Sequence, residues 1–302
     1  MNCNLPRYLY LNKTQAMPRR AISSAVRTPV LIVGGGPVGL YASALLSHFG
    51  VPSLLIERFS RGLRHPRSHL INTRTMELLR ELRVERRVRA LAPPQAEWRS
   101  FRYCTTLLGE EIALYDHLAA RGWTALHAAS PTEIIHVSQP GLERVLREEA
   151  LLLAPQVGAA LHFGYECGDI EQHAAGVRVQ LHRMAATGAL GGRGGRKGEG
   201  VGKDDGDVGS ATYVEAAHLL ACDGASSPIR RALRVELRGP PTLQHFRSVH
   251  FRDRSGHLSA RLEGRGSMLY FVFNPAVNIT PPQHPSVPTL NRQCSSFDFS
   301  VR

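Results

Sequence analysis

Three glycines and one acid, spaced along a short stretch, are residue types that could bind a dinucleotide. Gly34, Gly36 and Gly39 follow the apolar run 30–33, and Glu57 stands 18 residues after Gly39. The first glycine lets the chain turn sharply off a strand, the second leaves room for a pyrophosphate against the backbone, and the third allows close helix–strand packing. A carboxylate at the end of the next strand accepts hydrogen bonds from ribose hydroxyls.

This chemistry requires a strand, a turn, a helix and a second strand in that order. The sequence predicts a strand at 30–33, a helix from the turn to Phe49 and a second strand at 54–56. The N-terminal N–H groups of such a helix and the positive end of its dipole face the phosphates. This context favours a dinucleotide site over an ordinary structural turn. The candidate residues are Gly34, Gly35, Gly36, Pro37, Val38, Gly39, Glu57 and Arg58.

A second turn of the same kind follows a predicted strand at 213–221. It contains Asp223 and Gly224, and Ser227 followed by Pro228 predicts the start of a helix. Asp223 at the strand end could accept hydrogen bonds from hydroxyls, and the helix N-terminus or Arg230 could face a phosphate. Alone this would be an ordinary capped turn, but beside the first motif it predicts a second nucleotide-contacting turn.

The other predicted elements are less directly tied to chemistry. Helices are predicted from about Thr73 and from 138 onward, and strands at 161–165 and 177–181. Glu143 and Arg147 are spaced as an i,i+4 ion pair. Residues 98–130 have no clean helical period and are predicted to form strands or loops. Arg67 lies in a predicted loop, where it either reaches a phosphate or is a solvated surface arginine.

Composition and charge exclude several classes of protein. No apolar run approaches the ~20 residues of a membrane-spanning helix. Five scattered cysteines without a C-x-x-C pair argue against a disulfide framework or a zinc site and favour a reducing compartment, and the fourteen histidines show no metal-ligand spacing. The net charge of +12 reflects an arginine excess without interleaved aromatics, which indicates compositional bias rather than a nucleic-acid groove.

Two segments differ in composition from the rest. The N-terminal residues 1–29 contain five basic residues and no acid, which is typical of an organelle transit peptide or of a disordered basic tail on a cytoplasmic protein. Glycines and mixed charges between 187 and 210 predict a disordered insertion in a hairpin, and the absence of Gly-Lys-Ser or Gly-Lys-Thr there excludes a P-loop.

Five motifs in order give the chain a family resemblance. They are GGGPVGL at 34–40, ER at 57–58, HPRSHLINTRTMELLR at 65–80, SQPGLERVLREEA at 138–150 and ACDGASSPIRRAL at 221–233. Over residues 29–275 the chain resembles the class A flavoprotein monooxygenases, the FAD-dependent aromatic hydroxylases typified by p-hydroxybenzoate hydroxylase and phenol hydroxylase. Five ordered motifs are far more specific than any one of them.

The resemblance implies an α/β fold and a division into domains. A Rossmann-like FAD-binding domain of the glutathione-reductase type would be interrupted by a β-sheet substrate domain. The implied division is a basic tail or transit peptide at 1–28, the FAD-binding domain at 29–90 and 131–233 with a disordered insertion at 188–209, the substrate sheet at 91–130 and 234–279, and an irregular tail at 280–302.

The resemblance also implies an activity and its participants. NADPH or NADH would reduce FAD, and one oxygen atom of O2 would be transferred to a small phenolic substrate. The glycine turn would hold the pyrophosphate, Glu57 the ribose, and Arg67 and Gln139 other parts of the phosphate and ribityl region. Asp223 would lie beside FAD. We name no catalytic acid or base, because the cofactor carries most of the chemistry.

One feature of the family is missing from the sequence. Family members carry a further motif of the Gly-Asp-Ala-Ala-His type after the substrate sheet, and residues 276–302 contain no Gly-Asp pair. The expected functions are therefore an FAD-dependent monooxygenase or its N-terminal portion, a non-catalytic FAD- or nucleotide-binding remnant, or an NAD-dependent dehydrogenase. In the last case the Asp-Gly turn would be idle.

Overall fold

The computed structural model describes residues 25–60, 62, 68–119, 128–184, 212–240 and 255–274. Most of the predicted N-terminal tail, Arg67, the glycine-rich insertion and the C-terminal tail lie outside these residues. Within the described residues, no helix is both long enough and apolar enough to cross a membrane.

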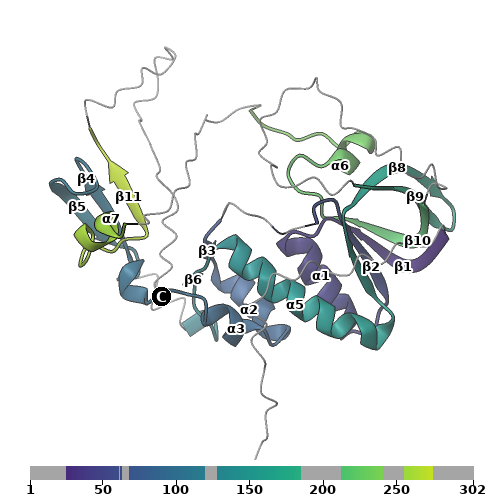
Figure 1. Ribbon diagram of the computed structural model, residues 1–302, viewed down its shortest axis with the longest axis horizontal. Coiled ribbons are helices and arrows are strands. Elements are labelled where there is room, and N and C mark those ends of the chain that lie inside the picture. The colour runs from purple at the N-terminus through teal and green to yellow at the C-terminus, as the bar shows by residue number, and fades with distance from the viewer. Residues whose placement is uncertain are drawn as a thin grey trace, which may run out of the picture.

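The largest sheet of the described structure has six strands (Figure 1). Its order is β7-β2-β1-β10-β9-β8; the first four strands run parallel, and β9 and β8 are antiparallel to their neighbours. The strands are β1 (Ala25–Val33), β2 (Ser53–Glu57), β7 (Ala160–Phe163), β8 (Tyr165–His173), β9 (Gly176–Arg183) and β10 (Thr212–Ala221). This arrangement confirms the Rossmann-like α/β fold.

Alternating apolar residues of β1 fill two separate cores. Val30 and Ile32 pack with helices α1 (Pro37–His48) and α5 (Gln139–Val157) on one face. Leu31 and Val33 belong to a second cluster with residues of β2, β8, β9 and β10. Because β2 also contacts β8, from which three strands separate it in the sheet order, the sheet curls back over its second face. A strand buried on both faces reads as the continuous apolar run seen in the sequence.

Two short helices and a small sheet contribute residues to the same core as α5. Helix α2 (Thr73–Glu81) begins at Asn72, whose side chain accepts a hydrogen bond from the Thr75 N–H at 2.8 Å. Helix α3 (Glu85–Arg89) follows, and both helices add side chains to the core that α1 and α5 share. A two-stranded sheet joins β3 (Leu70–Ile71) to β6 (Ile135–His136), so it brings the start of α2 close to the start of α5.

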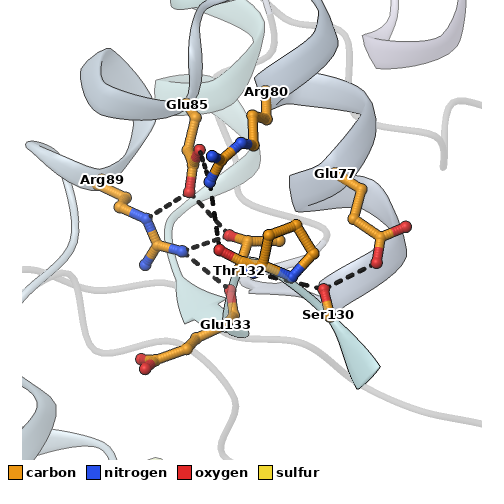
Figure 2. A network of polar contacts seen from close by, with 8 residues as sticks. Glu77, Arg80, Glu85, Arg89, Ser130, Thr132 and Glu133 are labelled. Carbon is orange, nitrogen blue, oxygen red and sulfur yellow. Dashed lines mark hydrogen bonds and ion pairs between the residues drawn. The ribbon is translucent and has the colours of Figure 1, made fainter. Parts of the chain in front are cut away.

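A polar network fastens residues 130–133 to α2 and α3 (Figure 2). The Glu85 carboxylate accepts hydrogen bonds from the Thr132 hydroxyl at 2.7 Å and from Arg89 at 2.9 Å, and Arg80 lies 3.7 Å away. Burial raises the pKa of the Glu85 carboxyl, but the hydrogen bonds from Thr132 and Arg89 outweigh it, and the pKa falls below its ordinary value of 4.5. Glu85 is therefore ionised wherever the protein is normally studied.

Thr132→Val should destabilise the protein at neutral pH and much less in acid. The variant loses the hydroxyl that Glu85 and Arg89 share, which costs about 1–2 kcal/mol at a buried site. A carboxyl whose folded pKa is depressed stabilises the fold above its unfolded pKa and stops doing so as the pH falls through the folded value. In urea titrations the difference between wild type and Thr132→Val should therefore shrink below about pH 4.5. A difference that stays constant from pH 7 to 3 would contradict this account.

A separate three-stranded sheet has the order β11-β4-β5. It consists of β4 (Ser100–Cys104), β5 (Glu111–Asp116) and β11 (Leu269–Val272), and the short helices η1 (Gln95–Glu97) and α7 (His257–Arg261) lie beside it in sequence. One face packs Cys104 and Tyr270 against Leu258 and Leu262 of the α7 region. The opposite face carries aromatic rings, with Tyr103 stacked on Phe271 at 4.9 Å between centroids.

One predicted strand is wrong in its extent. The prediction placed a single strand at 161–165, but β7 ends at Phe163 and β8 begins at Tyr165. Gly164 between them has φ +85°, a conformation that favours glycine and ends the strand. The long strand β8 was not predicted beyond Tyr165, because its sequence YECGDIEQH is polar and mostly only half-buried, without a clear alternation.

Candidate nucleotide-binding site

The two predicted turns lie side by side at the carboxyl ends of neighbouring parallel strands. β1 and β10 pair up to Val33 and Ala221, and the Cys222 N–H donates to the Val33 carbonyl at 2.8 Å. The Gly34 N–H donates to the Ile56 carbonyl at 2.9 Å, which ties the first turn to β2 as well. Ligands of open α/β sheets bind at such carboxyl ends. The fold thus joins two segments almost 190 residues apart in the sequence into one candidate site.

Gly34 and Gly39 are required by packing inside the protein. Gly34 has φ +113°, and a Cβ there would overlap the carbonyl oxygen of Cys222 in the second turn. A Cβ on Gly39 would overlap the carbonyl oxygen of Gly34. Both obstacles are backbone atoms, which cannot swing aside as a flexible side chain would. These two glycines therefore allow the first turn to pack closely against the second turn and against helix α1.

Gly36 differs from them because no neighbour among the described residues requires a glycine there. A Cβ built on Gly36 would have no atom within 4 Å, and its φ of −75° and ψ of −177° are accessible to any residue. Gly36 is the N-cap of α1, which has no side-chain cap and no acid in its first turn, while Val38 beside it is 69% exposed. The helix end is thus left open for an anion, and the bare glycine offers the close approach that a pyrophosphate needs.

Glu57 is held at this turn by two backbone hydrogen bonds. Its Oε2 accepts from the Gly35 N–H at 2.6 Å and its Oε1 from the Phe59 N–H at 2.9 Å. A Cβ on Gly35 would lie 2.8 Å from the Glu57 Cβ, so Gly35 is what allows the carboxylate to lie so close. Each carboxylate oxygen can accept a second hydrogen bond. Glu57 is therefore fixed in place with capacity left for ribose hydroxyls.

Asp223 has one oxygen in use and one without a partner. Its Oδ2 accepts from the Ser227 hydroxyl at 2.7 Å and from the Ile229 N–H at 3.3 Å, whereas its buried Oδ1 has no hydrogen-bond partner in the part of the chain that the structure describes. Burial, and then the negative charge of Asp223, raise the pKa of the neighbouring Cys222 thiol. Gly224 follows with φ +87°, which favours glycine. A buried carboxylate oxygen left unsatisfied is costly unless a ligand completes it.

The remaining predicted residues already have partners within the protein. Arg58 lies 3.6 Å from Glu166, Gln139 donates to Glu143 at 2.8 Å, and Arg230 donates to the Val235 carbonyl at 2.6 Å. Helix α6 (Pro228–Ala232) is a single short turn whose N–H groups are capped by Asp223 and Ser227, so its N-terminus is not left for a phosphate. The cofactor contacts of Arg58, Gln139 and Arg230 stay predictions, and Arg67 lies outside the described residues.

The predicted ion pair between Glu143 and Arg147 is wrong. The Glu143 carboxylate accepts from Gln139 instead, and Arg147 lies with its guanidinium carbon 4.5 Å from the centre of the Phe163 ring. The Nε of Arg147 is buried without a hydrogen-bond partner. Sequence reasoning therefore missed a cation at the edge of the site. Its position on α5, two turns after the helix start, gave no sign that it would face the end of β2.

A hollow elsewhere on the surface is a weaker candidate for the ligand site. It is lined by Arg27, Thr28, His173 and Glu215, among others, near the amino ends of β1 and β10. That is the end of the sheet opposite to the two glycine turns, where parallel strands do not normally bind ligands. The carboxyl ends therefore remain the candidate site.

Comparison with known proteins agrees with this geometry. The family described as FAD binding domain matches residues 27–297. The chain is similar to the 2,4-dichlorophenol 6-monooxygenases of Cupriavidus pinatubonensis, at 30% identity over 84% of the chain and 38% of the relative, and of Delftia acidovorans, at 27% identity over 85% and 39%. It is also similar to the crystal structure of the flavin-dependent monooxygenase PieE in complex with FAD and substrate, with a TM-score of 0.64 and 28% identity over 83% of the chain and 39% of that protein.

The fold and the paired turns are those of a Rossmann-like dinucleotide-binding domain. The chain belongs to the FAD binding domain family. The resemblance to the FAD-dependent aromatic hydroxylases is thereby confirmed. The chain spans about two fifths of the length of the relatives just described.

Proposed function

We propose that this chain binds FAD between its two glycine turns. The observation that carries the proposal is the juxtaposition of the open backbone at Gly36 with the unpartnered Oδ1 of Asp223, across strands that pair in register. The first turn offers room for a pyrophosphate against its backbone, and the second turn offers a hydrogen-bond acceptor for hydroxyls. Glu57, fixed by the Gly35 N–H, supplies a second acceptor for the ribose. FAD belongs here rather than NAD because the family is one of FAD binding domains.

We further propose that the whole protein hydroxylates an aromatic compound. When bound, FAD supplies the redox chemistry, with NADPH or NADH as reductant and O2 as oxygen source. The chain's own residues bind and orient: the glycine turn and Glu57 fix the adenosine half, and Asp223 fixes the part that reaches the second turn. The dichlorophenol monooxygenases support an aromatic substrate by analogy.

The three-stranded sheet is the proposed substrate domain. On the face opposite α7 it carries Phe101, Tyr103, Tyr115 and Phe271, with Tyr115 51% exposed. His117 stacks on Phe101 at 4.7 Å between ring centroids. Aromatic rings attract one another in offset and edge-to-face contacts, which supports an aromatic ligand on this face. The division of the chain into FAD-binding and substrate domains remains part of this proposal.

Ion pairing supports the proposal that no nucleic acid is bound. Several arginines between residues 74 and 89 form ion pairs with acids within the protein. The pairs are Arg74 with Glu77, Arg80 and Arg89 with Glu85, and Arg87 with Glu148 and Glu149. Arginines engaged in this way offer few free charges to a phosphate backbone.

The visible absorption spectrum of the purified protein tests the proposed function. We expect the bands of oxidised flavin, either as purified or after FAD is added and the excess removed by gel filtration. NADPH oxidation is then followed with and without 2,4-dichlorophenol as a probe. Flavin binding without turnover would favour the non-catalytic remnant, and protein that is colourless after incubation with FAD and gel filtration would refute FAD binding altogether.

A further inference from the structure

Arg147 on α5 is a cation without a hydrogen-bond acceptor among the described residues. Its Nε is buried and unpartnered, and neither nearby acid forms an ion pair with it: Glu143 accepts from Gln139, and Glu57 accepts from the backbone of Gly35 and Phe59. Burial lowers the pKa of the guanidinium, while Glu143 and Glu57 raise it. An arginine carries five N–H donors, and leaving them unpaired in a partly buried site is costly.

The guanidinium is nevertheless held in a defined position. It lies over the ring of Phe163, with its carbon 4.5 Å from the ring centre. A Cβ on Gly62 would lie 3.1 Å from Nη2 of Arg147, so the bare glycine leaves room for the guanidinium edge. Phe163 is the residue of β7 that pairs with Glu57 of β2, and the Gly164 N–H donates to the Glu57 carbonyl at 2.6 Å. Arg147 is thus placed at the carboxyl ends of β2 and β7.

The order of the strands suggests which part of a ligand binds the Arg147 guanidinium. Three adjacent parallel strands carry the glycine turn (β1), the ribose-binding carboxylate Glu57 (β2) and the Phe163 ring under Arg147 (β7). In a dinucleotide the ribose lies between the pyrophosphate and the adenine. If the first two groups occupy the ends of β1 and β2, the third falls at the end of β7. A guanidinium both stacks on aromatic rings and donates hydrogen bonds, and adenine offers a ring and nitrogen acceptors.

We propose that Arg147 is a binding residue for the adenosine half of the dinucleotide. It stacks on the adenine as it stacks on Phe163, and it donates its free N–H groups to acceptors of the adenosine. The inference rests on the proposed FAD binding, but it concerns only the adenosine half. ADP, which has that half without the flavin, therefore tests it separately from FAD, and FMN, which has the flavin without adenosine, provides the opposite comparison.

The experiment is calorimetric titration of FAD, ADP and FMN into the 302-residue protein and three variants. Arg147→Met keeps the apolar stem and removes the guanidinium, and we expect it to weaken FAD and ADP about 10- to 100-fold while FMN is unchanged. Arg147→Lys keeps the charge without the planar fork and should recover only part of the affinity. Arg144→Met removes an exposed arginine of the same helix and should change none of the three.

Thermal unfolding of the ligand-free variants separates binding from a structural role. Because the buried Nε of Arg147 has no hydrogen-bond partner among the described residues, Arg147→Met should melt at the wild-type temperature or above it. The rise in melting temperature on adding ADP should be smaller than for wild type. Equal ADP and FAD affinity in Arg147→Met and Arg144→Met, or an equal loss for FMN, would overturn the proposal. ADP binding that depends on Arg147 in a protein that does not bind FAD would instead refute the proposed function and leave this inference standing.

Discussion

Gly36→Val should abolish FAD retention while leaving the ligand-free protein folded, and Gly39→Val should strongly destabilise the ligand-free protein. The two positions are only three residues apart, yet an added side chain would meet different surroundings at each. A side chain at position 36 enters space with no atom within 4 Å, whereas one at position 39 overlaps the backbone carbonyl of Gly34. Overpacking against backbone costs about 3 kcal/mol or more. Loss of the favourable N-cap glycine costs about 1 kcal/mol or less.

The valine at position 36 would occupy the place where the pyrophosphate approaches the backbone. Excluding the phosphates from the N-terminus of α1 removes several charge-assisted hydrogen bonds at once, so affinity should fall more than about a hundredfold. Urea unfolding of the ligand-free variants and FAD content after gel filtration give the two readouts. Gly36→Ala, with a single methyl, should lie between glycine and valine. Normal flavin content in Gly36→Val would show that this turn does not hold the cofactor.

The parts of the fold that sequence reasoning predicted are those with strong local signals. β1, α1, β2 and α2 follow from apolar runs, a glycine turn and apolar residues at helical spacing, all of which act between residues near in sequence. The helix after Ser138 and the Ser227–Pro228 helix start follow in the same way. Such signals are reliable because the residues that form each element and the residues that end it lie close together in the sequence.

What escaped prediction depends on contacts between distant segments. The two-residue strands β3 and β6 pair across 64 positions in sequence and have no periodicity to detect. The place of Arg147 depends on β7 lying next to β2. Similarly, sequence shows that Gly34, Gly36 and Gly39 are glycines, but only the adjacency of Cys222 shows that Gly34 serves packing between the two turns.

The second large effect is expected at Asp223, where one side chain has a structural and a binding role on separate oxygens. Asp223→Asn preserves the shape, and its amide oxygen can still accept from the Ser227 hydroxyl and the Ile229 N–H. Its amide nitrogen then replaces the unpartnered Oδ1 and turns an acceptor into a donor. Stability should change by about 1 kcal/mol or less, while FAD affinity should fall about 10- to 100-fold.

Ser227→Ala is the matched control, because it removes the structural contact and leaves the binding oxygen. The serine hydroxyl donates to Asp223 at 2.7 Å and accepts from the Arg230 N–H at 2.9 Å, so its loss should cost about 1–2 kcal/mol of stability. FAD affinity in this variant should stay within about threefold of wild type, since a 0.6 kcal/mol change corresponds to that factor or less. Asp223→Asn should thus lose FAD affinity with little loss of stability, whereas Ser227→Ala should lose stability with little loss of FAD affinity. If Asp223→Asn binds FAD as tightly as wild type, the Oδ1 of Asp223 is not a cofactor contact, and the second turn serves only to start α6.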